Sequence, residues 1–226
     1  MELKTIARII NDFPTKFGLP RQSGLSDFKS EIIFEKEYSV DEAFRGIDEF
    51  SHLIIIWGFS EAERENWSPT VRPPRLGGNM RVGVFATRSP YRPNSIGLTV
   101  VKLISISKRD GRTVLTVSGA DMMSGTPVYD IKPYLTFADS VPDAVSGFAD
   151  GVREHSLDVV IDTDYSDVID EDRLQALVEV LSQDPRPSYQ NDPTRIYGFE
   201  YAGCEVKFSV KDKTLYVKSI TKKSEA

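Results

Sequence analysis

The stretch HLIIIWGF, residues 52–59, decides the fold of this chain. It is nearly continuous in apolar residues and rich in isoleucine, a pattern typical of a strand buried on both faces. Similar short runs occur on either side of it, each bounded by Gly, Pro, Asn or Ser. The runs that we expect to be strands are 3–10, 31–37, 52–59, 81–87, 96–105 and 113–118.

Helical patterns are rare among these runs, and only residues 41–45 predict a short helical turn. Strands that follow one another without intervening helices pair antiparallel, which favours a sandwich or barrel over a doubly wound sheet. The pattern alone does not show whether the sheet closes. We therefore expect a mainly β protein with a compact antiparallel core.

The last third of the chain has a different pattern. Apolar residues recur at i, i+3, i+4 and i+7 from Leu174, which predicts an amphipathic helix that ends before Asp184-Pro185. Three later runs, 196–201, 204–210 and 214–220, predict a small sheet. The predicted organisation is a first domain over 1–142, an acidic connector over 143–164 and a small α+β domain over 165–226.

The composition of the 226 residues, 40% hydrophobic and 27% charged, is that of a globular protein. The longest wholly apolar run, 53–57, is too short to span a bilayer. A single cysteine, Cys204, excludes an intrachain disulfide, and two distant histidines do not suggest a metal site. We expect a cytoplasmic protein with no membrane segment and no metal.

Charge is distributed unevenly along the chain. The formal net charge is −6, but residues 139–184 alone carry −11, whereas residues 1–138 carry +2. Residues 66–109 contain no acidic residue and eight basic ones: Arg72, Arg75, Arg81, Arg88, Arg92, Lys102, Lys108 and Arg109. These cations predict one positive face for phosphate, with the acidic block lying away from it. The alternative is that they pair with the acidic block.

The loop that follows residue 87 carries Arg88, Tyr91 and Arg92 and is stiffened by two prolines, Pro90 and Pro93. Proline fixes the backbone and lowers the entropy lost when side chains are held in place. Two guanidinium groups beside a flat ring suit a phosphate or carboxylate next to a base. The same residues could instead brace a structural loop.

Two further segments carry polar groups among apolar neighbours. Gln22 can donate and accept hydrogen bonds, which suits a base edge or an amino-acid group. Asp121, Asp130 and Tyr134 could supply a general base or a hydroxyl partner. Each could equally be a surface-loop, turn or cap residue. No glycine-rich dinucleotide fingerprint or phosphate-binding loop is present, so a Rossmann-type cofactor site is not expected.

Taken in order, these segments resemble the TsaA-like family of TrmO-type tRNA methyltransferases. The matching stretch with the highest specificity is RPPRLGGNMRVGVFATRSPYRPNSIGL, residues 72–98. KFGLPRQSGL, GIDEFSHL, SGTPVYDIKPYL and DPRPSY match in the same order. The resemblance covers residues 3–142 strongly and the C-terminal part more weakly.

The resemblance implies a compact β-barrel core, a homodimer and S-adenosylmethionine as cofactor. It implies methylation of the N6 nitrogen of N6-threonylcarbamoyladenosine, the modified base just 3′ of a tRNA anticodon. The residues that it implies for the cofactor are Pro20, Arg21, Gln22, Ser60, Glu61, Arg88, Leu98, Asp121, Met122, Met123 and Ser124. For catalysis we expect Asp121 or Asp130 as proton acceptor and Tyr134 as hydroxyl partner. For the substrate we expect Arg72, Arg75, Tyr91 and Arg92, with Arg92 or Arg75 on the threonyl carboxylate.

Three positions depart from the family pattern. Ser60 stands where relatives often have histidine, Ser124 replaces the aspartate of an Asp-Gly-Thr-Pro turn, and Ser95 replaces a proline. If that aspartate contacts the cofactor or acts as a base, its loss affects chemistry. Two alternatives therefore stay open: a catalytically weakened tRNA-binding or S-adenosylmethionine-sensing protein of the same fold, and a methyltransferase for another substrate.

Overall fold

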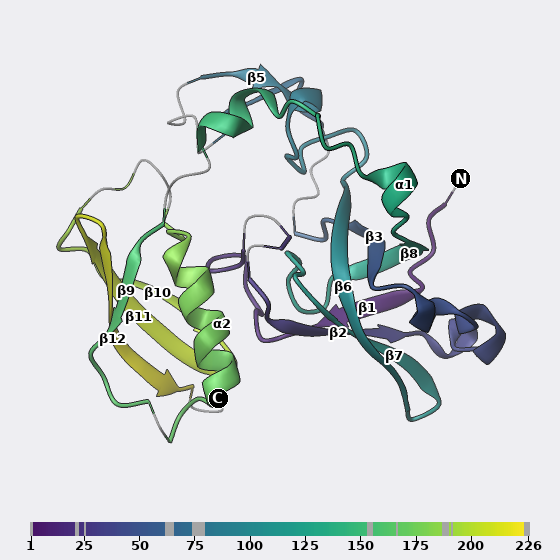
Figure 1. Cartoon of the computed structure of the whole chain (residues 1–226). Helices are drawn as coiled ribbons and strands as arrows, with labels where there is room; N and C mark the ends of the chain where they lie inside the picture. Colours follow the sequence, from purple (N-terminus) through teal and green to yellow (C-terminus); the bar gives the residue numbers. More distant parts are fainter. Residues whose placement is uncertain are drawn as a thin grey trace.

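The computed structural model describes residues 2–20, 23–24, 26–61, 66–73, 80–152, 156–165, 167–186, 190 and 192–223. These residues form two main sheets. Figure 1 shows the N-terminal sheet on the right and the C-terminal sheet, with its long helix, on the left.

Six antiparallel strands form the N-terminal sheet: β1 (Ala7–Ile10), β2 (Lys29–Phe34), β3 (His52–Gly58), β6 (Ile96–Arg109), β7 (Arg112–Ser118) and β8 (Pro127–Pro133). Their order is β1-β2-β7-β6-β3-β8. Because β8 pairs with both β3 and β1, the sheet closes on itself. The prediction of a mainly β, antiparallel fold is confirmed; below, this element is called the closed sheet.

The interior of the closed sheet follows the alternation of β3. Leu53, Ile55 and Trp57 are buried, while Ile54 and Ile56 face outward and are only partly covered. The apolar run therefore packs fully on one face, not on both as its sequence predicts. Because the sheet closes, a single inner face is enough to bury the core.

Two predictions near the middle of the chain are wrong in detail. The run 81–87 forms only the short strand β5 (Val82–Gly83), which pairs with β4 (Thr70–Val71). It then turns into the 3₁₀ helix η5 (Val84–Ala86), because the Val84 carbonyl accepts from both the backbone amide and the hydroxyl of Thr87. The helical turn at 41–45 is the 3₁₀ helix η2 (Asp41–Phe44), which lies between η1 (Lys36–Tyr38) and η3 (Ile47–Glu49).

The C-terminal elements are β9 (Asp158–Ile161), α2 (Glu171–Ser182), β10 (Tyr197–Tyr201), β11 (Cys204–Lys211) and β12 (Thr214–Lys222). Helix α2 and the last three strands match the predicted runs, whereas β9 lies in the predicted connector. The strands form a sheet in the order β10-β11-β12-β9, in which β9 runs parallel to β12. Helix α2 begins at Asp170, whose side chain accepts from the Arg173 amide, and it buries its predicted leucine stripe.

The two sheets are joined by side-chain contacts around the segment that follows β1. Phe13 is fully buried, with ring centroids 4.8 Å from Phe28 and 4.7 Å from Tyr201. Asp12 accepts a hydrogen bond from Arg173 Nε at 2.8 Å, and its carbonyl accepts from the Ala202 amide at 2.9 Å. The C-terminal unit therefore packs directly against the chain that leads out of β1.

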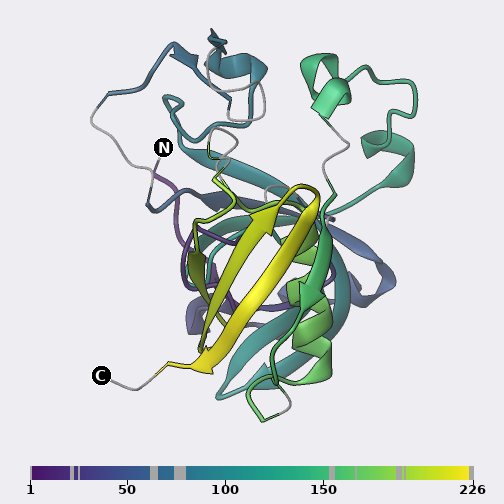
Figure 2. The same ribbon diagram turned by 90° about the vertical axis from the view of Figure 1, so that its left-hand side faces the viewer.

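Two segments project from one end of the molecule, as Figure 2 shows. The first arm, described over residues 66–73 and 80–95, contains β4, β5 and η5. The second arm, residues 136–152, contains α1 (Thr136–Asp139) and η6 (Gly147–Val152). Within the described residues, no helix is long and apolar enough to cross a membrane.

Candidate active site

A small pocket of about 80 Å³ opens at the end of the closed sheet where β3 ends. Its lining residues are Lys16, Leu19, Trp57, Gly58, Phe59, Ser60, Glu61, Asp121, Met122, Met123 and Thr126. Five of these are residues that the sequence predicts for the cofactor: Ser60, Glu61, Asp121, Met122 and Met123. The fold thus brings together two predicted segments that lie about sixty residues apart.

The turn that carries Asp121 is fixed from the side of β1. Asn11 Nδ2 donates to the Met122 carbonyl at 2.8 Å, and the Ser124 amide donates to the Phe13 carbonyl at 2.9 Å. The Ser124 hydroxyl accepts from the Asn11 amide at 3.3 Å. Ser124, at a position of departure from the family pattern, therefore helps to hold the turn and is not among the residues that line the pocket.

Asp121 is a half-buried carboxylate with several donors around it. The Thr99 hydroxyl donates to Asp121 Oδ1 at 2.6 Å. Burial raises the pKa of Asp121 above its usual range, and the hydrogen bonds from Thr99 and the Ser23 amide, with the positive charge of Arg88, oppose that rise. A proton acceptor whose pKa is raised towards neutrality suits general base chemistry.

Residues 23–24 lie beside the same turn. The Gly24 amide donates to the Gly119 carbonyl at 3.2 Å, which holds residues 23–24 beside the start of the Asp121 turn. Pro20, three residues before Ser23 in the sequence, is buried. Arg21 and Gln22, which are also predicted for the cofactor, lie outside the described residues. Arg88 is exposed and lies close enough for its charge to act on Asp121.

Leu98 does not join this pocket. Residues alternate along β6, so Thr99 points into the closed sheet while Leu98 points outward with 60% of its surface exposed. The Leu98 side chain is therefore not brought together with the other predicted cofactor residues at this pocket, and its cofactor contact stays a prediction.

The three predicted catalytic residues are not assembled at one place. Tyr134 follows β8 beside His52, at the opposite end of β3 from Trp57, because β8 runs antiparallel to β3. Asp130 forms a surface ion pair with Lys132 at 2.8 Å. Within one chain, only Asp121 lines the pocket.

The loop of the first arm is braced by the residues predicted to contact substrate. Arg92 Nη1 donates to the Thr87 carbonyl at 2.6 Å and the Val84 carbonyl at 3.3 Å, and its guanidinium lies 5.5 Å from the centroid of the Phe85 ring. Tyr91 is half-buried, and its carbonyl accepts from the Ser68 amide at 3.2 Å. The Ser95 hydroxyl, in place of the family proline, donates to the Pro90 carbonyl at 2.9 Å. Arg92 therefore stabilises the loop, which is one of the two roles that its sequence context left open.

The eight cations of residues 66–109 do not form one face. Lys108 pairs with Asp41, and Arg109 makes two hydrogen bonds to Glu31 at 2.6 and 3.2 Å, both at the far end of β6 from the first arm. Those carboxylates neutralise the two cations, so the single-face prediction is wrong for them. Arg72, Arg81 and Arg88 are exposed on the first arm, and Arg75 lies outside the described residues.

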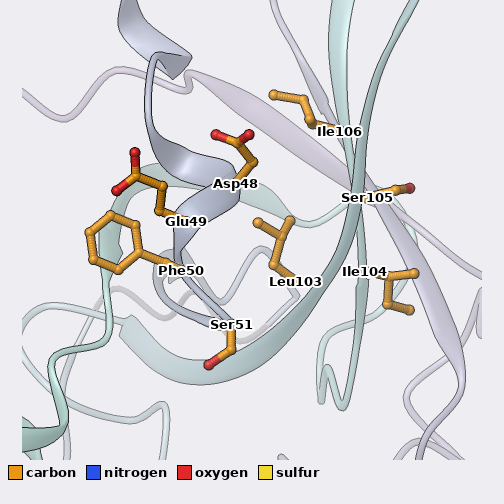
Figure 3. A pocket seen from close by; sticks show the side chains of 8 residues that line it. All are labelled: Asp48, Glu49, Phe50, Ser51, Leu103, Ile104, Ser105 and Ile106. Carbon is orange, nitrogen blue, oxygen red and sulfur yellow. The ribbon is translucent and has the colours of Figure 1, made fainter.

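A larger hollow of about 300 Å³ lies elsewhere on the closed sheet (Figure 3). Asp48 and Glu49 line one side, and apolar side chains of β6, including Ile104 and Ile106, line the other. It contains no predicted site residue, and its two carboxylates would repel phosphate. Within the described residues, no cluster of His, Cys, Asp or Glu could hold a metal ion. We therefore place the candidate site at the smaller pocket.

Sequence reasoning missed several residues that build this pocket. Trp57 and Thr99 have the pattern of ordinary strand residues, and Asn11 has that of a turn residue. Their role depends on partners 42, 22 and 111 positions away, to which a local pattern carries no signal.

Replacing Asp121 with asparagine should make the change in stability depend on pH. The folded pKa of Asp121 is raised, so between the unfolded and folded pKa values the folded protein holds a proton that the unfolded chain has lost. The wild type therefore loses stability relative to Asp121→Asn as pH rises from about 4, the ordinary aspartate pKa, towards neutrality. Urea unfolding of both proteins between pH 4 and 7 measures this difference.

The matched control is Asp130→Asn, which removes a surface carboxylate from its pair with Lys132. Asp130→Asn should not become more stable relative to the wild type as pH rises. A difference between Asp121→Asn and the wild type that stays constant over this pH range would contradict the electrostatic description of the pocket.

Both parts of the chain match known protein families. The family model for the tRNA-methyltransferase O N-terminal domain matches residues 8–140, and that for the TrmO C-terminal domain matches residues 161–223. The chain is 40% identical to an Escherichia coli protein named tRNA (adenine(37)-N6)-methyltransferase, covering 84% of this chain and 83% of the relative. It is 38% identical to a Pseudomonas aeruginosa protein named putative S-adenosylmethionine-dependent methyltransferase RcsF, covering 85% of each.

A solved structure agrees with these sequence matches. The crystal structure of TrmO from Pseudomonas aeruginosa superposes with a TM-score of 0.79 at 29% identity, covering 99% of this chain and 97% of that one. The two family models together match both sheets, and the solved structure covers nearly the whole chain. The chain therefore belongs to the tRNA-methyltransferase O family.

Proposed function

We propose that this protein transfers a methyl group from S-adenosylmethionine to the N6 nitrogen of adenine 37 of a tRNA. We further propose that the preferred adenine already carries an N6-threonylcarbamoyl group. The observation that carries the proposal is the match of both parts of the chain to the two family domains. The names of the relatives, which specify tRNA adenine 37 and S-adenosylmethionine, support it.

The pocket at Asp121 suits part of S-adenosylmethionine. The rings of Trp57 and Phe59, whose centroids lie 4.2 Å apart, and the side chain of Leu19 offer an apolar wall for a flat or aliphatic group. The Asp121 carboxylate offers a partner for a positive centre, such as an ammonium or sulfonium. When bound, the cofactor supplies a methyl group on a positively charged sulfur.

The chemistry asked of the chain is to position the acceptor and remove a proton. The N6 nitrogen of a carbamoylated adenine is a weak nucleophile because its lone pair is delocalised. We assign to Asp121 the role of taking the N6 proton as the nitrogen bonds to the methyl carbon. The bond between the sulfur and the methyl carbon breaks in this step, and the former cofactor leaves as a neutral thioether. Holding the N6 nitrogen in line with that bond supplies most of the remaining rate enhancement.

The first arm is the proposed tRNA contact. Arg72, Arg81 and Arg88 are exposed there, and Arg75 belongs to the same basic run. Tyr91 offers a ring for base stacking. Arg92 keeps its two backbone contacts and contributes its charge to the same loop. We propose Arg92 or Arg75 as the cation for the threonyl carboxylate.

Exposed apolar side chains on the two arms support a homodimer. On the first arm Phe85 is 69% exposed, and on the second arm Phe137 and Val145 are each 88% exposed. Large apolar side chains that are this exposed suit burial at an interaction surface. The pocket volume of about 80 Å³ is also well below the 300–1,000 Å³ of typical ligand sites. A second copy of the chain would cover these side chains and enlarge the site.

We interpret the closed sheet as the barrel implied by the family resemblance, within a methyltransferase domain over 1–142. The connector over 143–164 would include most of the second arm, and its strand β9 pairs with β12 of the α+β domain. The α+β domain over 165–226 would support the segment around Phe13. A tRNA substrate is consistent with action in the cytoplasm.

A methyl-transfer assay tests the proposed function against its alternatives. Purified protein with labelled S-adenosylmethionine should methylate tRNA that carries threonylcarbamoyladenosine, and should leave the same tRNA without this modification largely unlabelled. Labelling of both tRNAs would retain adenine 37 as the target and reject the threonylcarbamoyl requirement. Binding of tRNA without any methyl transfer would favour the weakened, tRNA-binding or S-adenosylmethionine-sensing alternative that Ser124 suggests.

Arg88→Ala should weaken cofactor binding much more than folding. Arg88 is exposed and its charge acts on Asp121, so its loss removes a charge from the site and little from the core. Titration calorimetry with S-adenosylmethionine should show a higher Kd, while the free energy of unfolding from urea denaturation stays within about 0.5 kcal/mol of the wild type. Arg112→Ala, which removes a distant pair with Glu35, is the control and should leave the Kd unchanged.

Salt dependence should identify the arginine residues that contact tRNA phosphates. Arg72→Ala should lower the slope of log affinity against log salt by about 1, because one phosphate contact is lost. Arg109→Ala should leave the slope unchanged, since Glu31 already neutralises that cation far from the first arm. Equal slopes for wild type and Arg72→Ala in filter binding would remove Arg72 from the tRNA interface.

Placing a charge on the second arm should dissociate the proposed dimer. Val145→Asp would put a carboxylate in an apolar interface, where its desolvation is unfavourable. Sedimentation at tens of micromolar should give a dimer mass for the wild type and a monomer mass for Val145→Asp. Val160→Asp, at an exposed site on β9, should remain dimeric. A wild type that is monomeric and fully active would overturn this part of the proposal.

A further inference from the structure

Asp121 stands at the end of a chain of hydrogen bonds that begins inside the closed sheet. Trp57 Nε1 lies 2.9 Å from Thr99 Oγ1, and Thr99 Oγ1 lies 2.6 Å from Asp121 Oδ1. Trp57 is 6% exposed and Thr99 is 1% exposed. Trp57 and Asp121 both line the pocket but Thr99 does not, so a buried hydroxyl connects the indole to the proposed proton acceptor.

The chemistry of these groups fixes the direction of the chain. The indole nitrogen of tryptophan is a donor only, so Thr99 must accept from Trp57. The Thr99 hydroxyl has a single hydrogen, and its remaining close partner is Asp121 Oδ1. The hydroxyl hydrogen therefore points at the carboxylate. A hydrogen bond to an ionised oxygen at 2.6 Å has the short length of a charge-assisted bond.

The backbone of β6 makes this arrangement possible. Gly97 pairs with Trp57 across the sheet, and a Cβ at Gly97 would overlap the indole ring. The absence of that side chain leaves room for the ring, whose Nε1 donates to Thr99, two residues further along the strand. The Phe59 ring packs against the indole with centroids 4.2 Å apart.

We propose that Thr99, oriented by Trp57, is a positioning residue that holds the Asp121 carboxylate ionised and aimed into the pocket. This inference rests on the proposed function, in which Asp121 accepts the N6 proton. Thr99 does not contact the substrate; it acts only through Asp121. Trp57 acts on Thr99 and not on Asp121: its Nε1 donates to the Thr99 oxygen, which leaves the hydroxyl hydrogen directed at Asp121.

Other charges also face Asp121 and must be held constant in any test. Arg88 from the first arm lowers its pKa, and the pocket lining adds Lys16 from the segment before Pro20 and Glu61 from the end of β3. All three side chains are unchanged by substitutions at Thr99. The Thr99 hydrogen bond lowers the pKa of Asp121 against the rise caused by burial, so its loss should raise that pKa.

The test compares Thr99→Val with Thr99→Ser. Valine keeps the shape and removes the hydroxyl, whereas serine restores the hydroxyl without the methyl group. Carboxyl ¹³C NMR titration, with the Asp121 signal assigned by its loss in Asp121→Asn, should show a higher pKa in Thr99→Val and a return towards the wild-type value in Thr99→Ser. Thr116→Val on β7 is the control and should not move the signal.

Kinetics provides the second measurement. Thr99→Val should lower kcat/KM at neutral pH by about tenfold to a hundredfold, as expected for loss of a hydrogen bond to a charged group. The acidic limb of its pH profile should move to higher pH together with the NMR titration. Trp57→Phe, which frees the Thr99 hydroxyl to rotate, should shift both in the same direction by a smaller amount.

The outcomes separate this inference from the proposed function. An Asp121 titration that is unchanged in Thr99→Val, or that Thr99→Ser does not restore, overturns the positioning role whether or not the protein methylates tRNA. The expected titration shifts in a protein that transfers no methyl group would support the hydrogen-bond chain and overturn the proposed function instead.

Discussion

The pairing of β8 with both β3 and β1 is the constraint on which the site depends. The turn that carries Asp121 leads directly into β8. Once β8 is paired on both sides, that turn must cross the end of the closed sheet where Trp57 and Thr99 point inward. Closure of the sheet therefore places a carboxylate over two buried polar groups that are distant from it in sequence.

The segment immediately after β1 connects this turn to the C-terminal unit. Asn11 and the Phe13 carbonyl hold the turn, while Asp12 binds Arg173 of α2 and the Phe13 ring packs against Tyr201 of β10. Three consecutive residues thus contact both the turn that carries Asp121 and the C-terminal unit. This gives a physical reason why a family of tRNA-modifying enzymes would combine these two units: the smaller unit stabilises the segment that holds the candidate site.

Cations that are close together in the sequence lie at different ends of the folded protein. The basic run of residues 66–109 splits, because β6 is long enough to carry Lys108 and Arg109 to acids at the far end of the closed sheet. The exposed arginines of the first arm remain on the end of the molecule from which both arms project. The net charge of −6 therefore says little about where a polyanion would bind.

By itself, the sequence determined the mainly β character, the amphipathic helix α2, the C-terminal strands and the family, because these depend on periodicity and motifs within short stretches. It also selected Ser60, Glu61 and the turn at Asp121, which meet at one pocket. It did not predict β8, whose proline-bounded run contains Asp130 and Lys132 and lacks a strand pattern. Only the tertiary structure decided that Tyr134 lies away from Asp121, that Leu98 faces outward and that Thr99 joins Trp57 to Asp121. Those outcomes follow from strand register and sheet closure, which couple residues tens of positions apart and leave no trace in a local pattern.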